Sequence, residues 1–149
     1  MMTIHFFYLI PTPLKFRKQL KLFIGELVKK EKGHINDINI IFCSDLYLLE
    51  INKNYLNHNF FTDVITFDLS NPKIQQKSAE IYISIDRIRE NSIEYQSTIN
   101  NELHRVIFHG VLHLCGYKDK TKLQRTEIKS KEDFYLSKYF KKQIVPRGT

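Results

Sequence analysis

The segment HGVLHLCGYKD, residues 109–119, holds the residues best suited to chemistry. On a helix, His109 and His113 would face the same way, because four steps of about 100° return a side chain to within roughly 40° of its start. Gly116 is a residue type that ends helices with a positive φ, so the chain can fold back and bring Asp119 to the same point. Two imidazoles and one carboxylate could hold a divalent ion and leave a position open for water, which is typical of catalytic zinc.

The residues around the two histidines favour a shared ligand over two unrelated core histidines. The stretch VIFHGVLHLCG is apolar nearly all round, as expected of a buried helix, where an unpartnered imidazole is costly. His104 lies on a different side of this helix and is not expected to join the site. Cys115 also points elsewhere, and we interpret it as a small buried hydrophobe.

The residue after the first histidine argues against an ordinary zinc protease. The helical protease signature HExxH has a glutamate there as general base, whereas this chain has Gly110. A residue without a side chain also lets another segment, or a substrate, approach the helix closely. A metal-dependent peptide or amide hydrolase stays an alternative only, because it would need another general base.

Three segments resemble one known family. HGVLHLCGYKD resembles the HGxLHLxGYDH signature of the YbeY family, bacterial metal-dependent endoribonucleases of ribosomal RNA maturation. INKNYLNHNFFTDVITFD (51–68) is similar to the family's LNxxYRxxDxPTDVLSF segment, and AEIYIS (79–84) resembles its GDIVIS strand. The blocks stand in family order over about residues 37–135. The resemblance implies a single-strand endoribonuclease that acts in maturation of the 16S ribosomal RNA 3′ end and in ribosome quality control.

The resemblance also implies a cofactor and partners. We expect one divalent ion per chain, zinc or another metal, which would lower the pKa of a bound water towards ~7 or polarise a phosphoryl oxygen. Ribosomal RNA and the small ribosomal subunit are the implied partners, and ribosomal proteins or GTPases stay open. Asp63, in the matched TDVITF strand, is a candidate for orienting groups near the site, unless it only hydrogen-bonds its own loop.

Two positions depart from the family pattern. The family's third ligand is usually histidine, whereas this chain has Asp119 at that position. A carboxylate oxygen can bind zinc at about 2.0–2.2 Å. It also suits harder metal ions better than an imidazole does. Leu56 stands where the family has an arginine thought to contact phosphate, which leucine cannot do. His58 or Lys53 could supply charge instead, although His58 could equally be a simple loop residue. Because of Leu56, a non-catalytic ribosome-biogenesis factor with a structural metal remains an alternative function.

Length and composition fit one domain, which we place at 1–149. With 42% hydrophobic and 26% charged residues, the chain is ordinary for a soluble globular protein. Cys43 and Cys115 lack metal or redox spacing, which fits free thiols in a reducing cytoplasm. MMTIHFFYLIP predicts a first strand rather than a signal peptide, and no stretch approaches the ~18 apolar residues of a membrane span. We expect a cytoplasmic protein without membrane contact and assign the C-terminal IVPRGT no function.

The charge balance is compatible with RNA. A net charge of +7, from 23 Lys and Arg against 16 Asp and Glu, favours a polyanion through counterion release. The excess gathers at 15–21, 29–32 and 118–142. Lysine-rich helices are often only solvated faces, so the charge supports RNA binding only beside the metal motif.

Hydrophobic periodicity predicts an α+β fold with about four strands in a mixed sheet and a zincin-like central helix that bears the metal. The expected strands are 3–9, 37–42, 62–67 and 79–85, and the expected helices are 13–33, 44–55, 86–96, 99–115 and 121–141. The third and fourth strands should be neighbours. Ser44 and Thr121 should cap helices. The side chains expected to face the core include Phe16, Leu46, Leu49, Phe134, Tyr139 and Phe140.

Overall fold

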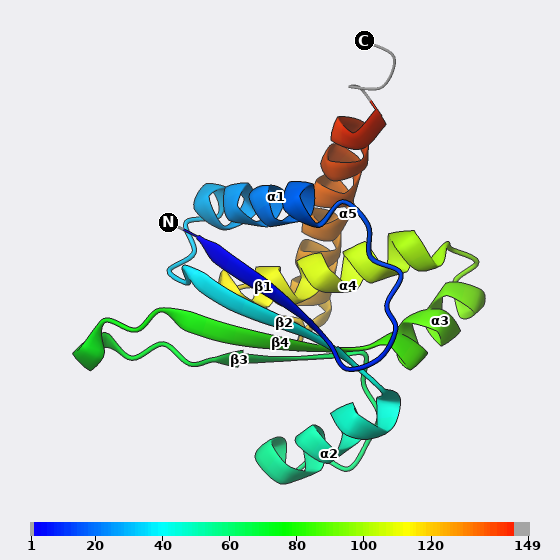
Figure 1. Cartoon of the computed structure of the whole chain (residues 1–149), viewed down its shortest axis with the longest axis horizontal. Coiled ribbons are helices and arrows are strands. Elements are labelled where there is room, and N and C mark those ends of the chain that lie inside the picture. Colours follow the sequence, from blue (N-terminus) through cyan, green and yellow to red (C-terminus); the bar gives the residue numbers. More distant parts are fainter. Residues whose placement is uncertain (1, 145–149) are drawn as a thin grey trace.

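The computed structural model describes residues 2–144, which form one α+β domain around a four-stranded sheet (Figure 1). The strand order is β1-β2-β4-β3, built from β1 (Thr3–Tyr8), β2 (Asp37–Cys43), β4 (Ser78–Ser84) and β3 (Val64–Asp68). β1, β2 and β4 run parallel, and β3 pairs antiparallel with β4. The sheet is therefore mixed, as predicted, and β1 and β3 are its two edges. Residues 145–149, which include most of the IVPRGT segment, lie outside the described part.

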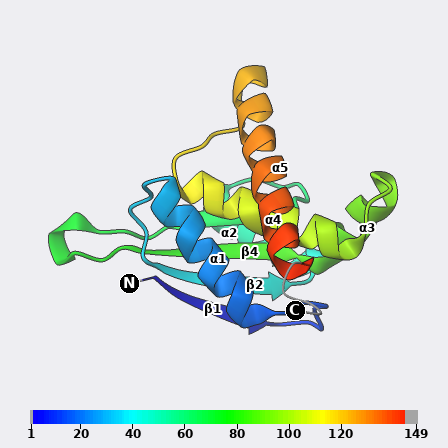
Figure 2. The same cartoon turned by 90° about the horizontal axis from the view of Figure 1, so that it is seen from above.

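Helices lie on both faces of the sheet. α1 (Arg17–Lys30) and α4 (Ile99–Leu114) cover one face, and α5 (Lys122–Ile144) packs against α4 (Figure 2). α2 (Asp45–Leu56) lies on the other side, and α3 (Ile85–Glu94) follows β4 directly (Figure 1). The β3–β4 connection contains a 3-10 turn, Pro72–Ile74. Over residues 2–144, none of the helices has the length and apolar character needed to cross a membrane.

Two apolar clusters hold these layers together. In the larger cluster, Ile38 and Ile40 of β2 and Ile81 and Ile83 of β4 pack with the apolar sides of α1, α4 and α5. A smaller cluster on the opposite face joins the sheet to α2, through Cys43, Leu48, Ile51 and Ile65. The two central strands are thus buried on the face that packs with α1 and α4 and partly covered on the face of α2, where Glu80 and Tyr82 are half-buried.

Short polar side chains begin four of the helices. The Ser44 hydroxyl accepts a hydrogen bond from the Tyr47 N–H at 3.1 Å, and Thr121 accepts one from the Gln124 N–H at 3.1 Å. Both caps were predicted, because a hydroxyl can satisfy N–H groups that have no partner within the first helical turn. Ser84 and Thr98 cap α3 and α4 in the same way.

The predicted inward residues of α2 and α5 are partly wrong. Leu46 is 69% exposed, and Leu48 and Ile51 face the sheet instead. Phe134 is exposed beside Tyr135, which is buried. In both helices apolar residues stand next to each other in the sequence, so periodicity alone leaves the helical phase uncertain by one residue.

The predicted start of the first helix is also wrong. α1 begins at Arg17 rather than near residue 13, and Phe16 is an exposed N-cap residue with φ of 56°. A left-handed residue at this point separates the proline-containing segment from the helix. The segment before α1 is therefore not helical, and Leu14 is its buried contact.

Gly110 is the point at which the central helix approaches the sheet. A Cβ added at this position would lie 2.9 Å from Cγ2 of Ile81 in β4 and 3.4 Å from Cγ2 of Thr66 in β3. Both neighbours are β-branched side chains, which have little rotational freedom to move aside. The sequence suggested that glycine at this position permits close approach by another segment. The structure shows that the sheet is the part that approaches it.

We predict that Gly110→Ala destabilises the protein by about 1–3 kcal/mol, as overpacking of a tight core does. Alanine has the higher helix propensity, so any loss must come from the clash. Urea unfolding will measure it, with Gly25→Ala in α1 as the control. The nearest atom to a Cβ at Gly25 is 3.6 Å away, so that variant should be as stable as wild type or more so. Equal stability of both variants would contradict this account of the packing.

Candidate metal centre

α4 brings the two predicted histidines together at its C-terminal end. The Nε2 atoms of His109 and His113 are 2.9 Å apart. Gly116 has φ of 105°, and the chain turns back there so that Oδ2 of Asp119 lies 3.2 Å from Nε2 of His113 and 3.4 Å from Nε2 of His109. In tetrahedral zinc sites, bonds of about 2.0–2.2 Å place ligand atoms roughly 3.3–3.6 Å apart. The three side chains therefore meet with nearly the spacing of a metal ligand set.

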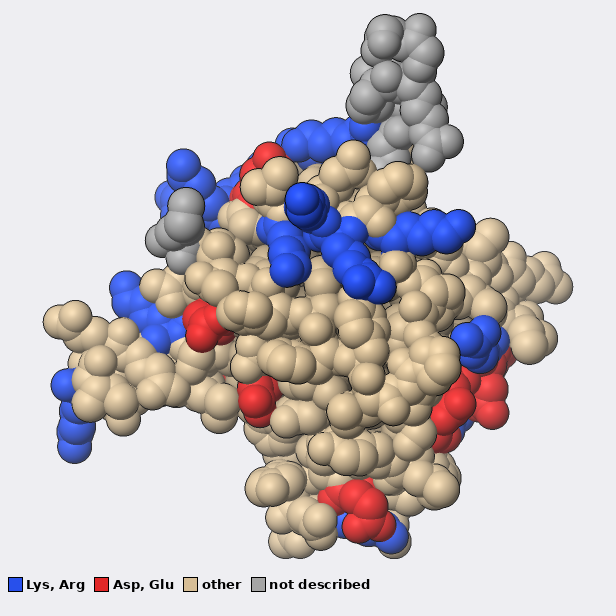
Figure 3. All heavy atoms as spheres, viewed as in Figure 1, with Lys and Arg blue, Asp and Glu red and all other residues tan. Residues whose placement is uncertain are grey.

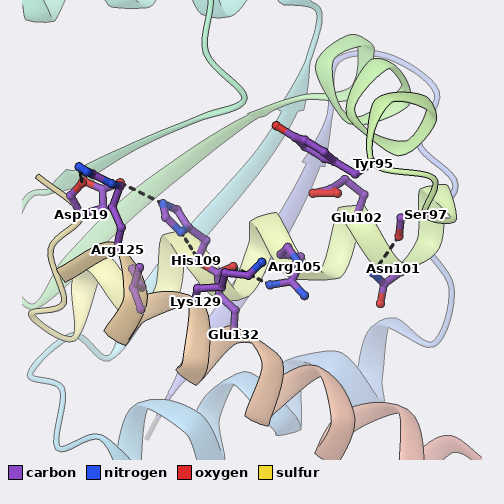
Figure 4. Close-up of a pocket in the computed structure, with 11 residues that line it drawn as sticks. Tyr95, Ser97, Asn101, Glu102, Arg105, His109, Asp119, Arg125, Lys129 and Glu132 are labelled. Atoms are coloured by element: carbon purple, nitrogen blue, oxygen red, sulfur yellow. Dashed lines mark hydrogen bonds and ion pairs between the residues drawn. The ribbon is translucent and has the colours of Figure 1, made fainter. Parts of the chain in front are cut away.

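Each imidazole is oriented by an oxygen on its other side. Nδ1 of His109 donates to Oε2 of Glu132 at 2.6 Å, as Figure 4 shows, and Nδ1 of His113 donates to the carbonyl oxygen of Tyr117 at 2.9 Å. In a neutral imidazole the second nitrogen is then an acceptor. Two nitrogen lone pairs and the Asp119 carboxylate thus converge on one point, which favours a cation. The donor set fits a divalent ion.

The turn after α4 is anchored by the C-terminal end of α1. The Tyr117 hydroxyl donates to Oε1 of Glu31 at 2.7 Å, and the Tyr135 hydroxyl donates to the other oxygen of Glu31. Glu31 is the C-cap residue of α1 and its side chain is only 9% exposed. This contact fixes the residue whose carbonyl orients His113, so the position of that imidazole depends on α1 as well as α4.

Glu132 is the residue that the sequence analysis missed. Its side chain is 8% exposed, and its second oxygen accepts from Arg105 at 2.9 Å. Arg105 also pairs with Asp133 at 2.6 Å. A signal was present, because Glu132 stands four residues after Ile128 and three before Tyr135, within the buried stripe of α5. A carboxylate in a buried stripe needs a partner.

The electrostatics of the site are dominated by carboxylates. Burial alone would lower the pKa of the His109 imidazole, but the hydrogen bond and charge of Glu132 reverse this effect. Asp63 and Asp119 add to it, so the pKa of His109 lies above its ordinary value. Burial also raises the pKa of Asp63, whose Oδ2 accepts from Nδ2 of Asn91 at 3.4 Å. A cation at this point would be stabilised by the same negative potential.

The candidate ligands lie between two hollows. One, of about 570 Å³, lies over α4 and α5 and is lined by Arg105, Arg125 and Lys129 together with Tyr95 (Figure 4). The other, of about 530 Å³, lies between α2 and β3. His109 and Asp119 line both hollows, so a long substrate could cross the site from one to the other.

The second hollow contains most of the other residues singled out from the sequence. Leu56, His58 and Asp63 line it together with the three candidate ligands. Lys53 is exposed on α2 and does not line it, whereas Lys120 does. Lys53 was one possible source of positive charge beside His58, and the lysine that lines the hollow is Lys120. A lysine beside Asp119 is better placed.

Two residues excluded from the site by helical geometry do lie elsewhere. His104 is buried among Phe108, Tyr139 and Phe140, and its Nδ1 donates to the carbonyl oxygen of Asn100 at 2.7 Å. Cys115 packs against the main core, and burial raises the pKa of its thiol to about 11. Neither residue belongs to the candidate ligand group.

Fold and site together define an α+β protein with a candidate metal centre at one edge of its sheet. The family model described as Endoribonuclease YbeY matches residues 11–140, and the chain belongs to this family. A relative from Cytophaga hutchinsonii, named Endoribonuclease YbeY, is 46% identical over 125 residues, which cover 83% of this chain and 86% of the relative. One of the same name from Karelsulcia muelleri is 48% identical over 119 residues, or 80% and 82% of the two chains.

A solved structure has the same fold. The solution structure of TM1509 from Thermotoga maritima matches with a TM-score of 0.62 and 28% sequence identity. The match covers 99% of this chain and 94% of that one. The similarity therefore extends over the complete α+β domain rather than the metal helix alone.

We predict that Glu132→Gln lowers affinity for a divalent ion about 10- to 100-fold, because loss of an outer carboxylate weakens the histidine ligand it orients. Competition with a chromophoric chelator will measure this affinity. Asp133→Asn is the matched control, since Asp133 also pairs with Arg105 but contacts no candidate ligand. Equal metal affinity in the two variants would show that Glu132 serves only to hold Arg105.

Substitutions at position 119 test whether the Asp119 carboxylate is a metal ligand. Asp119→Ala should weaken metal binding by more than about tenfold, because a ligand should contribute at least as much as an outer partner. Asp119→His should retain the ion, because imidazole is also a zinc ligand. Metal content and affinity of both variants test this. If wild type and both variants bind metal equally, Asp119 is not a ligand.

Proposed function

We propose that the whole chain, residues 1–149, is a single metal-dependent endoribonuclease domain that cleaves single-stranded ribosomal RNA. Its proposed role is maturation of the 16S 3′ end and ribosome quality control, with the small ribosomal subunit as partner. The observation that carries the proposal is the convergence of His109, His113 and Asp119 between two hollows, one of which also contains Arg125 and Lys129. The family to which the chain belongs supports the nuclease activity.

The side chains of this chain have separable roles in the proposed reaction. A bound divalent ion, zinc or another metal, supplies Lewis acidity towards a phosphoryl oxygen and activates water for attack. His109 and His113 present their Nε2 atoms to it, held by Glu132 and the Tyr117 carbonyl. Asp63, a half-buried residue that lines the second hollow, is proposed to orient reacting groups, with His58 nearby.

Positive charge supports an RNA substrate. Arg125 and Lys129 line the hollow over α4 and α5 on one side of the candidate ligands, and Lys120 lines the other hollow. Further Lys and Arg side chains gather over α1 on the face in Figure 3. Phosphates bound by these side chains would release counterions, which favours association with a polyanion.

We also propose a cytoplasmic location. Cys43 and Cys115 are free thiols, which suits a reducing compartment. Ribosomal proteins or GTPases as additional partners stay open.

One observation favours a second candidate function. Leu56 lines the hollow beside the ligands and supplies no charge there. A non-catalytic ribosome-biogenesis factor with a structural metal would tolerate this residue. A peptide or amide hydrolase is less well supported, because Gly110 packs against the sheet and provides no general base.

Cleavage of ribosomal RNA with and without a chelator tests the proposal. We expect weak metal-dependent cleavage by the wild type and none by His113→Ala, which controls for a contaminating nuclease. Leu56→Arg should raise the rate roughly tenfold, because a guanidinium can stabilise the phosphoryl transition state. If neither wild type nor Leu56→Arg cuts RNA in a metal-dependent way, the non-catalytic function is the correct one.

A further inference from the structure

An aromatic pair lines the hollow between α2 and β3 and has no role in holding the metal ligands. The rings of His58 and Phe60 are stacked, with centroids 5.1 Å apart and planes 21° apart. Phe60 is 55% exposed, although it lines a hollow that also contains His109 and Asp119. An exposed aromatic face beside a candidate catalytic centre is a surface on which a planar group can stack.

The aromatic pair is held in position by a buried side chain. Nδ2 of Asn52, a buried residue of α2, donates to the carbonyl oxygen of Phe60 at 2.8 Å. The carbonyl oxygen of Asn52 accepts from the His58 N–H at 3.1 Å. Both residues of the pair are thus tied to the same helical turn, so the stacking surface is fixed relative to the sheet and the ligands.

The edge of β3 offers hydrogen-bonding groups to the same hollow. The Ser84 N–H donates to the Asp63 carbonyl at 3.0 Å, and the Leu69 N–H donates to the Ser78 carbonyl at 2.9 Å. Residues of an antiparallel strand alternate between bonding to the partner strand and pointing away from it. Asp63 and Leu69 bond to β4, so the residues at steps of two between them, Ile65 and Phe67, bond to it as well. The N–H and C=O of Thr66 therefore point away from β4. Thr66 lines the hollow, and its backbone donor and acceptor lie on the open edge of β3.

We propose that this hollow is a nucleobase subsite that takes one unpaired base of the RNA, stacked on Phe60 with its edge at the Thr66 backbone. This inference rests on the proposed function. The volume of about 530 Å³ lies within the range of small-molecule pockets. A base inside a duplex is paired and stacked and cannot enter, so the subsite selects single-stranded RNA. Lys120 lines the same hollow, where it can contact an adjacent phosphate.

A double-mutant cycle between protein and RNA tests the stacking contact. The ligands are a single-stranded oligoadenylate of about eight nucleotides and a ribose-phosphate chain of equal length without bases. Fluorescence anisotropy of the metal-loaded protein, read before measurable cleavage, gives both affinities. Phe60→Ala should weaken oligoadenylate binding roughly 5- to 100-fold and leave binding of the chain without bases unchanged. Phe60→Tyr should keep both affinities, because it keeps an aromatic face.

Phe61 is the matched control. It is 48% exposed in the same loop, but its ring lies 5.3 Å from the Arg87 guanidinium and it does not line the hollow. Phe61→Ala should bind both ligands like wild type. Equal weakening of both ligands by Phe60→Ala would assign Phe60 a structural role and overturn the subsite.

The outcomes also separate the subsite from the proposed function. If wild type cleaves RNA while Phe60→Ala and Phe61→Ala bind oligoadenylate alike, the subsite is wrong and the nuclease stands. If the base-dependent loss is found without any metal-dependent cleavage, the subsite stands and the nuclease is wrong. A wild type that binds neither ligand overturns both.

Discussion

The close contact between α4 and the sheet at Gly110 is the constraint on which the site depends. It allows the helix to lie against β3 and β4 without an intervening side chain. His109 is adjacent in sequence and therefore emerges beside the edge strand rather than away from it. His113 follows one turn later. A larger residue at this position would separate the helix that carries the candidate ligands from the strand that forms one wall of the hollow between α2 and β3.

The second layer of the site comes from elements distant in sequence. α5 supplies Glu132 to His109, while α1 supplies Glu31 to the turn that orients His113. Both carboxylates are mostly buried and fully engaged by hydrogen-bond donors, which offsets the cost of removing them from water. The two imidazoles are therefore held by two helices, α5 and α1, that contact each other where Tyr135 and Lys131 meet Glu31, and their convergence is a property of the assembled core.

The two hollows together offer groups that suit a chain of alternating phosphates and bases. The hollow over α4 and α5 contains Arg105, Arg125 and Lys129 beside an equal number of carboxylates, and the hollow between α2 and β3 contains Leu56 and Phe60 beside the candidate ligands and Lys120. Leu56 lies in the hollow between α2 and β3, which also contains Phe60. An apolar side chain there suits the proposed base, and Lys120 and the opposite hollow provide the charge for phosphate binding.

Much of this protein follows from local sequence rules, and the rest from packing. The spacing of His109 and His113, the turn at Gly116 and the caps at Ser44 and Thr121 depend on neighbouring residues only, so the sequence predicted them, together with the mixed α+β sheet. The orientation of Leu46 and Phe134 was not predictable, because adjacent apolar residues leave the helical phase open until a helix packs. Glu132 and the aromatic pair at Phe60 acquire their significance from contacts with α4 and β3. Such contacts join segments far apart in sequence, and only the tertiary structure decides them.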